Sequence, residues 1–197
     1  MINAVRFHHT PDITVINQRQ YDAHNTLYKG YVTQINKITD ELSKVSADVK
    51  KESNTTDGEY RGLKRGETYA LNGVILHELY FRNIGGLCQA PSKEILDMLQ
   101  KYFGGYEQWK EDFIATAKAS RGWTILAYDQ RSSILRNLSL DDHDTGAVVL
   151  SLPILVLDMY EHAYMIQYGI EKMNYINAFI ENIHWDILRQ RVLNYQL

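Results

Sequence analysis

The chain has 197 residues, of which 45% are hydrophobic and 23% charged, and its formal net charge is -3. This length and composition can bury one substantial core or two smaller ones, which excludes a disordered or fibrous chain. The small net charge provides no basic field, so we expect neither nucleic acid nor a membrane as a partner.

The single cysteine, Cys88, excludes an intramolecular disulfide and is typical of a reducing compartment, so a cytoplasmic location is expected. No apolar stretch reaches the length of a membrane span, and the first residues lack the apolar core of a signal peptide. We therefore expect the protein to stay in the compartment where it is made.

The N-terminal half is predicted to be helical. Apolar residues between positions 17 and 48 recur mostly at steps of three and four, which indicates one face of a long helix. Residues 50–67 are charged and rich in turn-forming types, which predicts an exposed connection. A second helix is predicted over residues 68–83, and the pair Gly85-Gly86 is expected to end it in the left-handed conformation.

The second half mixes helices and strands. Helices are predicted over residues 91–102 and 106–120, with a glycine pair between them. Three short segments rich in β-branched residues then predict strands at positions 123–129, 132–140 and 147–158. Helical spacing returns from Glu161 onward, so the order of elements predicts an α+β fold with a helical N-terminal half.

Four residues at positions that read as buried form a candidate metal site. Asp158 ends a very apolar strand, and His162 follows it by one helical turn. His24 lies on the first predicted helix and His77 on the second. A buried lone carboxylate is costly unless it is paired, hydrogen-bonded or bound to metal. Three neutral imidazoles and one carboxylate suit iron, manganese, zinc or copper.

Simpler interpretations of these residues stay open. Asp158 could cap the following helix with His162 on the surface, and a single histidine on an apolar helix face is more often a hydrogen-bonded core residue than a ligand. A hydrolytic zinc enzyme would need an acid or base beside a metal-bound water, and no motif favours it.

The segment DMYEHAY, which starts at Asp158, resembles the DVWEHAY signature of the iron/manganese superoxide dismutases, in which the Asp and the His bind the metal. HELYFRNIGG, RGWTIL and YINAFIENIHWDILRQR resemble three further segments of that family, and the resemblance covers about residues 13–195. It implies an N-terminal helical hairpin domain over residues 1–88. It also implies a C-terminal domain over residues 89–197, with a three-stranded antiparallel sheet flanked by helices.

The resemblance implies a superoxide dismutase, an oxidoreductase that converts superoxide to oxygen and hydrogen peroxide at one manganese or iron ion per chain. The implied ligands are His24, His77, Asp158 and His162. His143 takes the place of the residue that hydrogen-bonds the solvent on the metal, and Tyr31 that of the tyrosine that limits access to small anions. As an alternative, His143 is a solvated turn histidine. The implied aromatic shell is Phe81, Trp123 and Tyr160, although each of these could equally be ordinary core.

Glu161 resembles the residue that reaches the metal-bound His162 of the partner subunit, which implies a homodimer and leaves a tetramer open. Its charge could instead simply favour the N-terminus of a helix. The interval from His24 to Tyr31 is one residue shorter than the family pattern, and without that deletion Ala23 takes the ligand position. The alternative function is therefore a dismutase-like protein with a degenerate metal site and a structural or interaction role.

Overall fold

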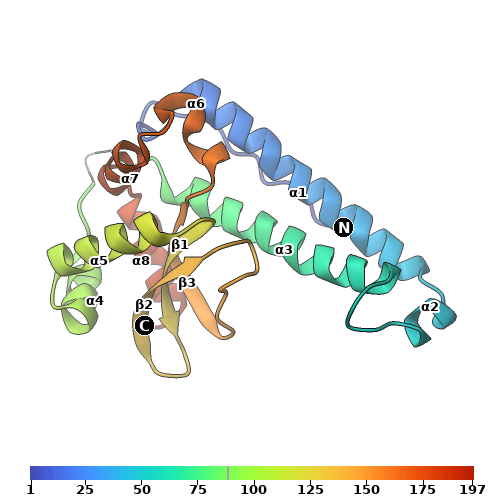
Figure 1. Cartoon of the computed structure of the whole chain (residues 1–197). Coiled ribbons are helices and arrows are strands. Elements are labelled where there is room, and N and C mark those ends of the chain that lie inside the picture. Colours follow the sequence, from blue (N-terminus) through green and yellow to red (C-terminus); the bar gives the residue numbers. More distant parts are fainter. Residues whose placement is uncertain (88) are drawn as a thin grey trace.

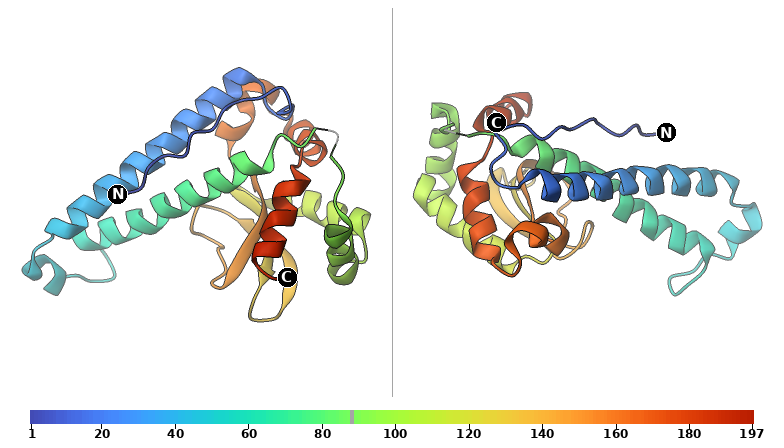
Figure 2. Two further views of the ribbon diagram at one scale, coloured as in Figure 1. Left: turned by 180° about the vertical axis from the view of Figure 1, so that it is seen from behind. Right: turned by 90° about the horizontal axis from the view of Figure 1, so that it is seen from above.

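The computed structural model describes residues 1–87 and 89–197, so Cys88, on which the expected location rests, lies outside the described residues. The N-terminal half is a long helical hairpin, with a short helix at its tip (Figure 1). The segment before the hairpin runs back along it (Figure 2). The helices of this half are α1 (Gln18–Lys44), α2 (Ala47–Lys51) and α3 (Glu59–Asn83).

The hairpin differs from the predicted helices at its tip. α1 stops at Lys44 because Val45 is extended and the Ser46 side chain caps α2. α3 begins at Glu59, so the second half of the predicted connection is helical. Its Glu, Arg, Leu and Lys residues are good helix formers, and this part of α3 packs against α1 where Gly66 meets Ile38.

The glycine pair after α3 has a different role from the one predicted. α3 ends at Asn83 as expected, but Ile84 is extended and forms a β-bridge with Ile183. A Cβ on Gly86 would lie 1.9 Å from the carbonyl oxygen of Ile183, so only glycine permits this crossing of two chain segments. Gly85 has φ +100° and turns the chain into the crossing.

The C-terminal half contains a three-stranded antiparallel sheet in the order β2-β1-β3, which confirms the α+β fold. The first strand has the predicted bounds, and the other two begin later than predicted. The 3-10 helix η1 opens the final helical part, as the return of helical spacing indicated. The elements are α4 (Lys93–Phe103), α5 (Tyr106–Ala119), β1 (Trp123–Asp129), β2 (Ile134–Leu140), β3 (Ser151–Asp158), η1 (Glu161–Ala163), α6 (Met165–Tyr168), α7 (Lys172–Glu181) and α8 (Trp185–Asn194).

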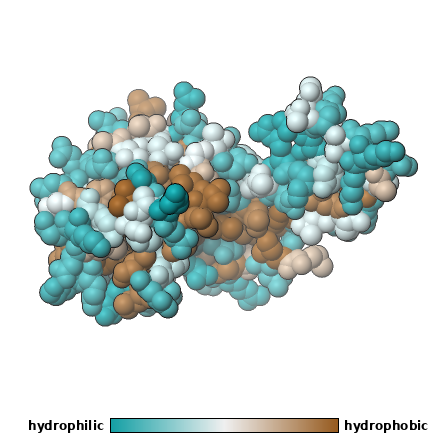
Figure 3. Space-filling view, turned by 90° about the horizontal axis from the view of Figure 1, so that it is seen from below, coloured by the Kyte–Doolittle hydropathy of each residue, from teal (hydrophilic) through white to brown (hydrophobic). Residues whose placement is uncertain are grey.

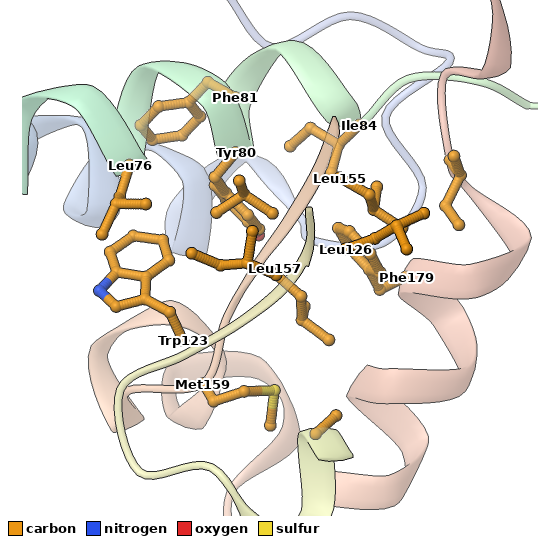
Figure 4. Packing of buried hydrophobic residues seen from close by; sticks show 14 of the residues in the cluster. Leu76, Tyr80, Phe81, Ile84, Trp123, Leu126, Leu155, Leu157, Met159 and Phe179 are labelled. Carbon is orange, nitrogen blue, oxygen red and sulfur yellow. The ribbon is translucent and has the colours of Figure 1, made fainter. Parts of the chain in front are cut away.

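The core joins the two halves. α3 lies against β3, and α5 packs on β1 and β2. Figure 4 shows Leu76 and Tyr80 of α3 directed toward Trp123 and Leu157 of the sheet. This packing brings the C-terminal part of α3 to the end of β3, where the polar residues of the next section meet.

The surface carries apolar side chains where the sheet meets the hairpin, as seen from below (Figure 3). Ile75 and Val148 are among the exposed apolar residues, and both line a hollow of about 220 Å³ between α3 and the sheet. In the part of the chain that the structure describes, no helix combines the length and the apolar character needed to cross a membrane.

Candidate metal centre

Four polar side chains meet inside the molecule where the hairpin joins the sheet. They are His24 on α1, His77 on α3, Asp158 at the last position of β3, and His162 in η1. One ligand atom of each lies within 4.8 Å of all the others. His24, His77 and Asp158 are fully buried, and His162 is partly exposed.

α1 brings both His24 and Tyr31 to this group. The two residues are seven positions apart, about two turns of an α-helix, so their side chains share one face. α1 is continuous, so the short interval between them needs no rewinding of the helix. Ala23 is exposed, whereas Nε2 of His24 lies 3.0 Å from Oδ2 of Asp158. His24, not Ala23, therefore belongs to the group.

Gly73 on α3 makes room for the ring of Tyr31. A Cβ at Gly73 would lie 2.9 Å from Cδ1 of that ring, closer than side-chain carbons normally approach. The ring centroid of Tyr31 consequently lies 5.3 Å from that of His77 and 4.7 Å from that of His143.

The carboxylate of Asp158 is the point on which the imidazoles converge. Its Oδ2 lies 3.0 Å from Nε2 of His24, 3.2 Å from Nε2 of His162 and 3.6 Å from Nε2 of His77. Its Oδ1 accepts the backbone N–H of Tyr160 at 2.9 Å. Burial alone would raise the pKa of Asp158, but His162 and His24 outweigh burial and hold that pKa well below its usual value.

Two of the three imidazoles, those of His24 and His77, are held in the neutral form that binds metal. Burial lowers the pKa of His24 and, more strongly, that of His77, which keeps both rings neutral near pH 7. Burial also opposes protonation of His162, but the Asp158 carboxylate outweighs it and raises the pKa of His162. Nδ1 of His77 donates to the Gly73 carbonyl at 2.6 Å, so its Nε2 carries the lone pair.

A metal ion fits this donor set. Nε2 of His77 is buried without a hydrogen-bond partner among the described residues, although it lies beside an ionised carboxylate. Two acceptors that face each other in a buried site repel, and a cation between them removes that cost. Three nitrogens and one carboxylate oxygen suit manganese or iron, and the carbonyl that orients His77 is a common support of metal-binding histidines.

His143 lies beside the four residues and is fully buried, so it is not a solvated turn histidine. The indole N–H of Trp123 donates to its Nδ1 at 2.9 Å. Burial lowers the pKa of His143, so the neutral ring carries its proton on Nε2. This second nitrogen is buried and has no partner within the described part of the chain. The arrangement leaves one free hydrogen-bond donor next to the cluster.

Aromatic rings surround the group on several sides. Phe81 lies 5.0 Å from His24 and Trp123 lies 5.0 Å from His77, measured between ring centroids. Tyr160 stacks on His162 at 5.1 Å with an interplanar angle of 18°. The predicted aromatic shell is thus adjacent to the cluster. Glu161 is exposed, next to His162 in η1.

Gln20, Tyr69 and Asp142 also lie at the site, although the sequence patterns did not indicate them. The amide of Gln20 donates to the His162 carbonyl at 2.6 Å and accepts the Ile166 N–H at 3.0 Å, so it ties α1 to the segment that carries His162. Gln20 lies one turn before His24, and a polar residue at that position of a buried face is a signal that could have identified it. The Tyr69 ring lies 4.5 Å from that of His143, and Asp142 accepts a hydrogen bond from Tyr160.

Known proteins similar to this chain bind the metals that suit this donor set. Residues 91–191 match the family described as iron/manganese superoxide dismutases, C-terminal domain. The iron superoxide dismutase of Aquifex pyrophilus is 37% identical over 173 residues, which cover 87% of this chain and 79% of that protein.

Manganese superoxide dismutase 1 of Halobacterium salinarum is 36% identical over 169 residues, covering 83% of this chain and 79% of that protein. The iron superoxide dismutase of Saccharolobus solfataricus is 32% identical over 180 residues, covering 88% of this chain and 84% of that protein. With these matches on both halves of the fold, the chain belongs to the iron/manganese superoxide dismutase family.

Proposed function

We propose that this protein is a superoxide dismutase that binds one manganese or iron ion per chain through His24, His77, Asp158 and His162. The proposal rests on the convergence of these four side chains in a buried group that contains an ionised carboxylate. Two superoxide anions and two protons give one molecule of oxygen and one of hydrogen peroxide. A bound manganese or iron ion would supply the one-electron couple, reduced by the first superoxide and oxidised by the second.

Two residues next to the cluster hold protons for this reaction. Nε2–H of His143 is a buried donor with no partner among the described residues, so it is available to an oxygen atom of substrate or solvent. Burial raises the pKa of Tyr31, so its hydroxyl keeps its proton at neutral pH and can donate as well. Because Tyr31 is half-buried at the edge of the group, we assign it the role of the residue that limits access to small anions.

The aromatic shell excludes water from the centre. Phe81 and Trp123 are buried against the ligand histidines, and Tyr160 stacks on the ring of His162. Low local polarity strengthens each electrostatic contact made inside such a site. We therefore assign Phe81, Trp123 and Tyr160 the role of walls.

The test compares wild-type protein with His24→Ala after expression without added metal. Elemental analysis and superoxide consumption are measured on the same samples. We expect near one manganese or iron ion per wild-type chain, and loss of both metal and activity in the variant. His8→Ala is the matched control, because His8 is exposed and distant in sequence from the ligands. Metal-free, inactive wild-type protein would instead support the degenerate-site alternative.

We also propose that the chain forms a homodimer in which Glu161 contacts His162 of the partner subunit. Glu161 is exposed beside His162, and the exposed apolar residues Ile166 and Ile170 follow shortly after, which supports an interface there. Light scattering of wild-type protein and Glu161→Ala tests the dimer, and a monomeric wild-type protein contradicts it.

We further propose that the chain divides into two domains at residue 88 and that the protein is cytoplasmic. The single cysteine in the sequence supports the location.

A further inference from the structure

Two segments that carry site residues run past the same end of the sheet. One follows β2 and contains His143, and the other follows β3 and contains His162. Gly122 connects them through its backbone, because its N–H donates to the Leu140 carbonyl at 2.9 Å and its carbonyl accepts the Met159 N–H at 2.8 Å. A Cβ at Gly122 would lie 3.0 Å from the backbone of the first segment, so glycine permits this approach without a shift of that segment.

A side-chain hydrogen bond also joins the segment after β2 to the segment after β3. The hydroxyl of Tyr160 donates to Oδ1 of Asp142 at 2.5 Å. Both residues are half-buried. Hydrogen bonds from a hydroxyl to an ionised carboxylate are short and about twice as strong as neutral ones. The contact therefore holds the Tyr160 ring more firmly than ring packing alone would.

Tyr160 transmits this restraint to three parts of the cluster. Its backbone N–H donates to Oδ1 of Asp158 at 2.9 Å, and its ring stacks on His162. The ring centroid also lies 5.1 Å from that of His143. A shift of the Tyr160 ring consequently changes the surroundings of two of the four proposed ligands and of the neighbouring donor.

We propose that Asp142 is a positioning residue of the metal centre: by accepting the Tyr160 hydroxyl, it holds the ring against His162 and ties the His143 segment to the ligand segment. The inference rests on the proposed metal site, and it adds a residue that touches neither ligand nor substrate. Supports of ligand geometry typically change metal affinity by about 10-fold to 100-fold when removed. The expected consequence is slow release of bound metal in the wild type.

The test follows release of Mn²⁺ from manganese-loaded full-length protein into excess chelator. We expect Asp142→Ala and Tyr160→Phe each to accelerate release about 10-fold. The double variant should be no faster than either single one, because both remove the same hydrogen bond. Asp142→Asn keeps a neutral acceptor for the hydroxyl and should accelerate release only about threefold. Asp141→Ala, at the exposed neighbouring carboxylate, is the matched control and should match wild type.

Two further measurements keep the outcome interpretable. Manganese(II) electron paramagnetic resonance should change in Asp142→Ala and Tyr160→Phe and return toward wild type in Asp142→Asn, while thermal unfolding of the metal-free variants checks the fold. Release at the wild-type rate in Asp142→Ala, or single effects that multiply in the double variant, would overturn the inference.

Superoxide consumption by the same samples separates this inference from the proposed function. If wild-type protein is inactive but the variants release metal faster than it does, the positioning role is supported and the dismutase activity is refuted. An active wild-type protein with unchanged release in Asp142→Ala would refute the positioning role alone. Wild-type protein that binds neither manganese nor iron overturns both.

Discussion

Two buried polar clusters tie α3 to β3, and they differ in one respect. In the first, the Arg191 guanidinium donates to the Ile154 carbonyl at 2.7 Å, to the Leu79 carbonyl at 3.2 Å, and to the side-chain oxygen of Asn83. The Asn83 amide in turn donates to the Val156 carbonyl at 2.8 Å. Each of these polar atoms has a partner. The cluster therefore satisfies the carbonyl groups at the outer edge of β3 and needs no bound ion or ligand to complete its hydrogen bonds.

The cluster around Asp158, at the end of the same strand, is not closed in this way. Nε2 of His77, which faces the Asp158 carboxylate, and Nε2 of His143, beside the cluster, are buried without partners among the described residues. Burial of polar groups is common to both clusters, so burial does not distinguish a structural cluster from a functional one. The unsatisfied atoms make that distinction, since they mark where a bound ion or substrate would supply the missing contact.

The strongest test of this contrast removes the carboxylate from the open cluster. In Asp158→Asn, metal content and superoxide consumption should fall by at least about 100-fold, more than when a support of the ligands is lost. The fold should persist, because the Asn side-chain oxygen can still accept the Tyr160 N–H. Elemental analysis and activity on one sample measure the effect. Normal metal content in this variant would mean that Asp158 is not a ligand.

The closed cluster should respond in stability rather than in metal binding. Arg191→Met leaves the Asn83 side-chain oxygen and the Ile154 carbonyl buried without this donor, which we expect to cost about 3 kcal/mol of unfolding free energy. Urea unfolding of the metal-free protein measures this cost, and Arg191→Lys should recover part of it. The folded variant should keep its metal. Loss of metal at unchanged stability would contradict the separation of the two clusters.

A smaller effect is expected at the donor beside the open cluster. His143→Leu should keep the metal but lower superoxide consumption about 10-fold, because it removes the free Nε2–H while filling similar space. His143→Gln retains an N–H donor and should lose less. Steady-state rates normalised to metal content measure the effect. Equal rates in His143→Leu and wild type would show that the buried donor has no part in the reaction.

The smallest effect concerns a carboxylate outside both clusters. Hydrogen bonds from Ser132 and Arg136 lower the pKa of Asp129 to about 2. The folded carboxylate binds fewer protons than the unfolded one, whose pKa is about 3.9. Its stabilising contribution is therefore complete above about pH 4 and is lost as the pH falls toward about 2. Thermal unfolding of metal-free wild type and Asp129→Asn should differ near pH 6 and converge on acidification. A gap that widens in acid would contradict this assignment.

Local sequence patterns predicted the elements that carry the site. The β-branched content of residues 123–129 and the turn residues on either side placed β1 with its observed bounds. The spacing of Asp158 and His162 predicted a carboxylate and an imidazole at a strand end, and helical periodicity placed His77 on a buried face. These features depend on interactions within one turn or one strand, so a single segment contains the information. The resemblance to the family then joined the four residues into one site.

Only the tertiary structure decided how distant segments support that site. Gln20 contacts His162 across 142 positions of sequence, and Asp142 meets Tyr160 where the segments that follow β2 and β3 approach each other at Gly122. Residues 59–67 extend α3 to the tip of the hairpin, where Gly66 packs on Ile38 of α1, and Gly86 permits a crossing with Ile183 that no local pattern predicts. Periodicity reports which face of an element is buried, whereas the partner on that face depends on packing between elements far apart in the chain.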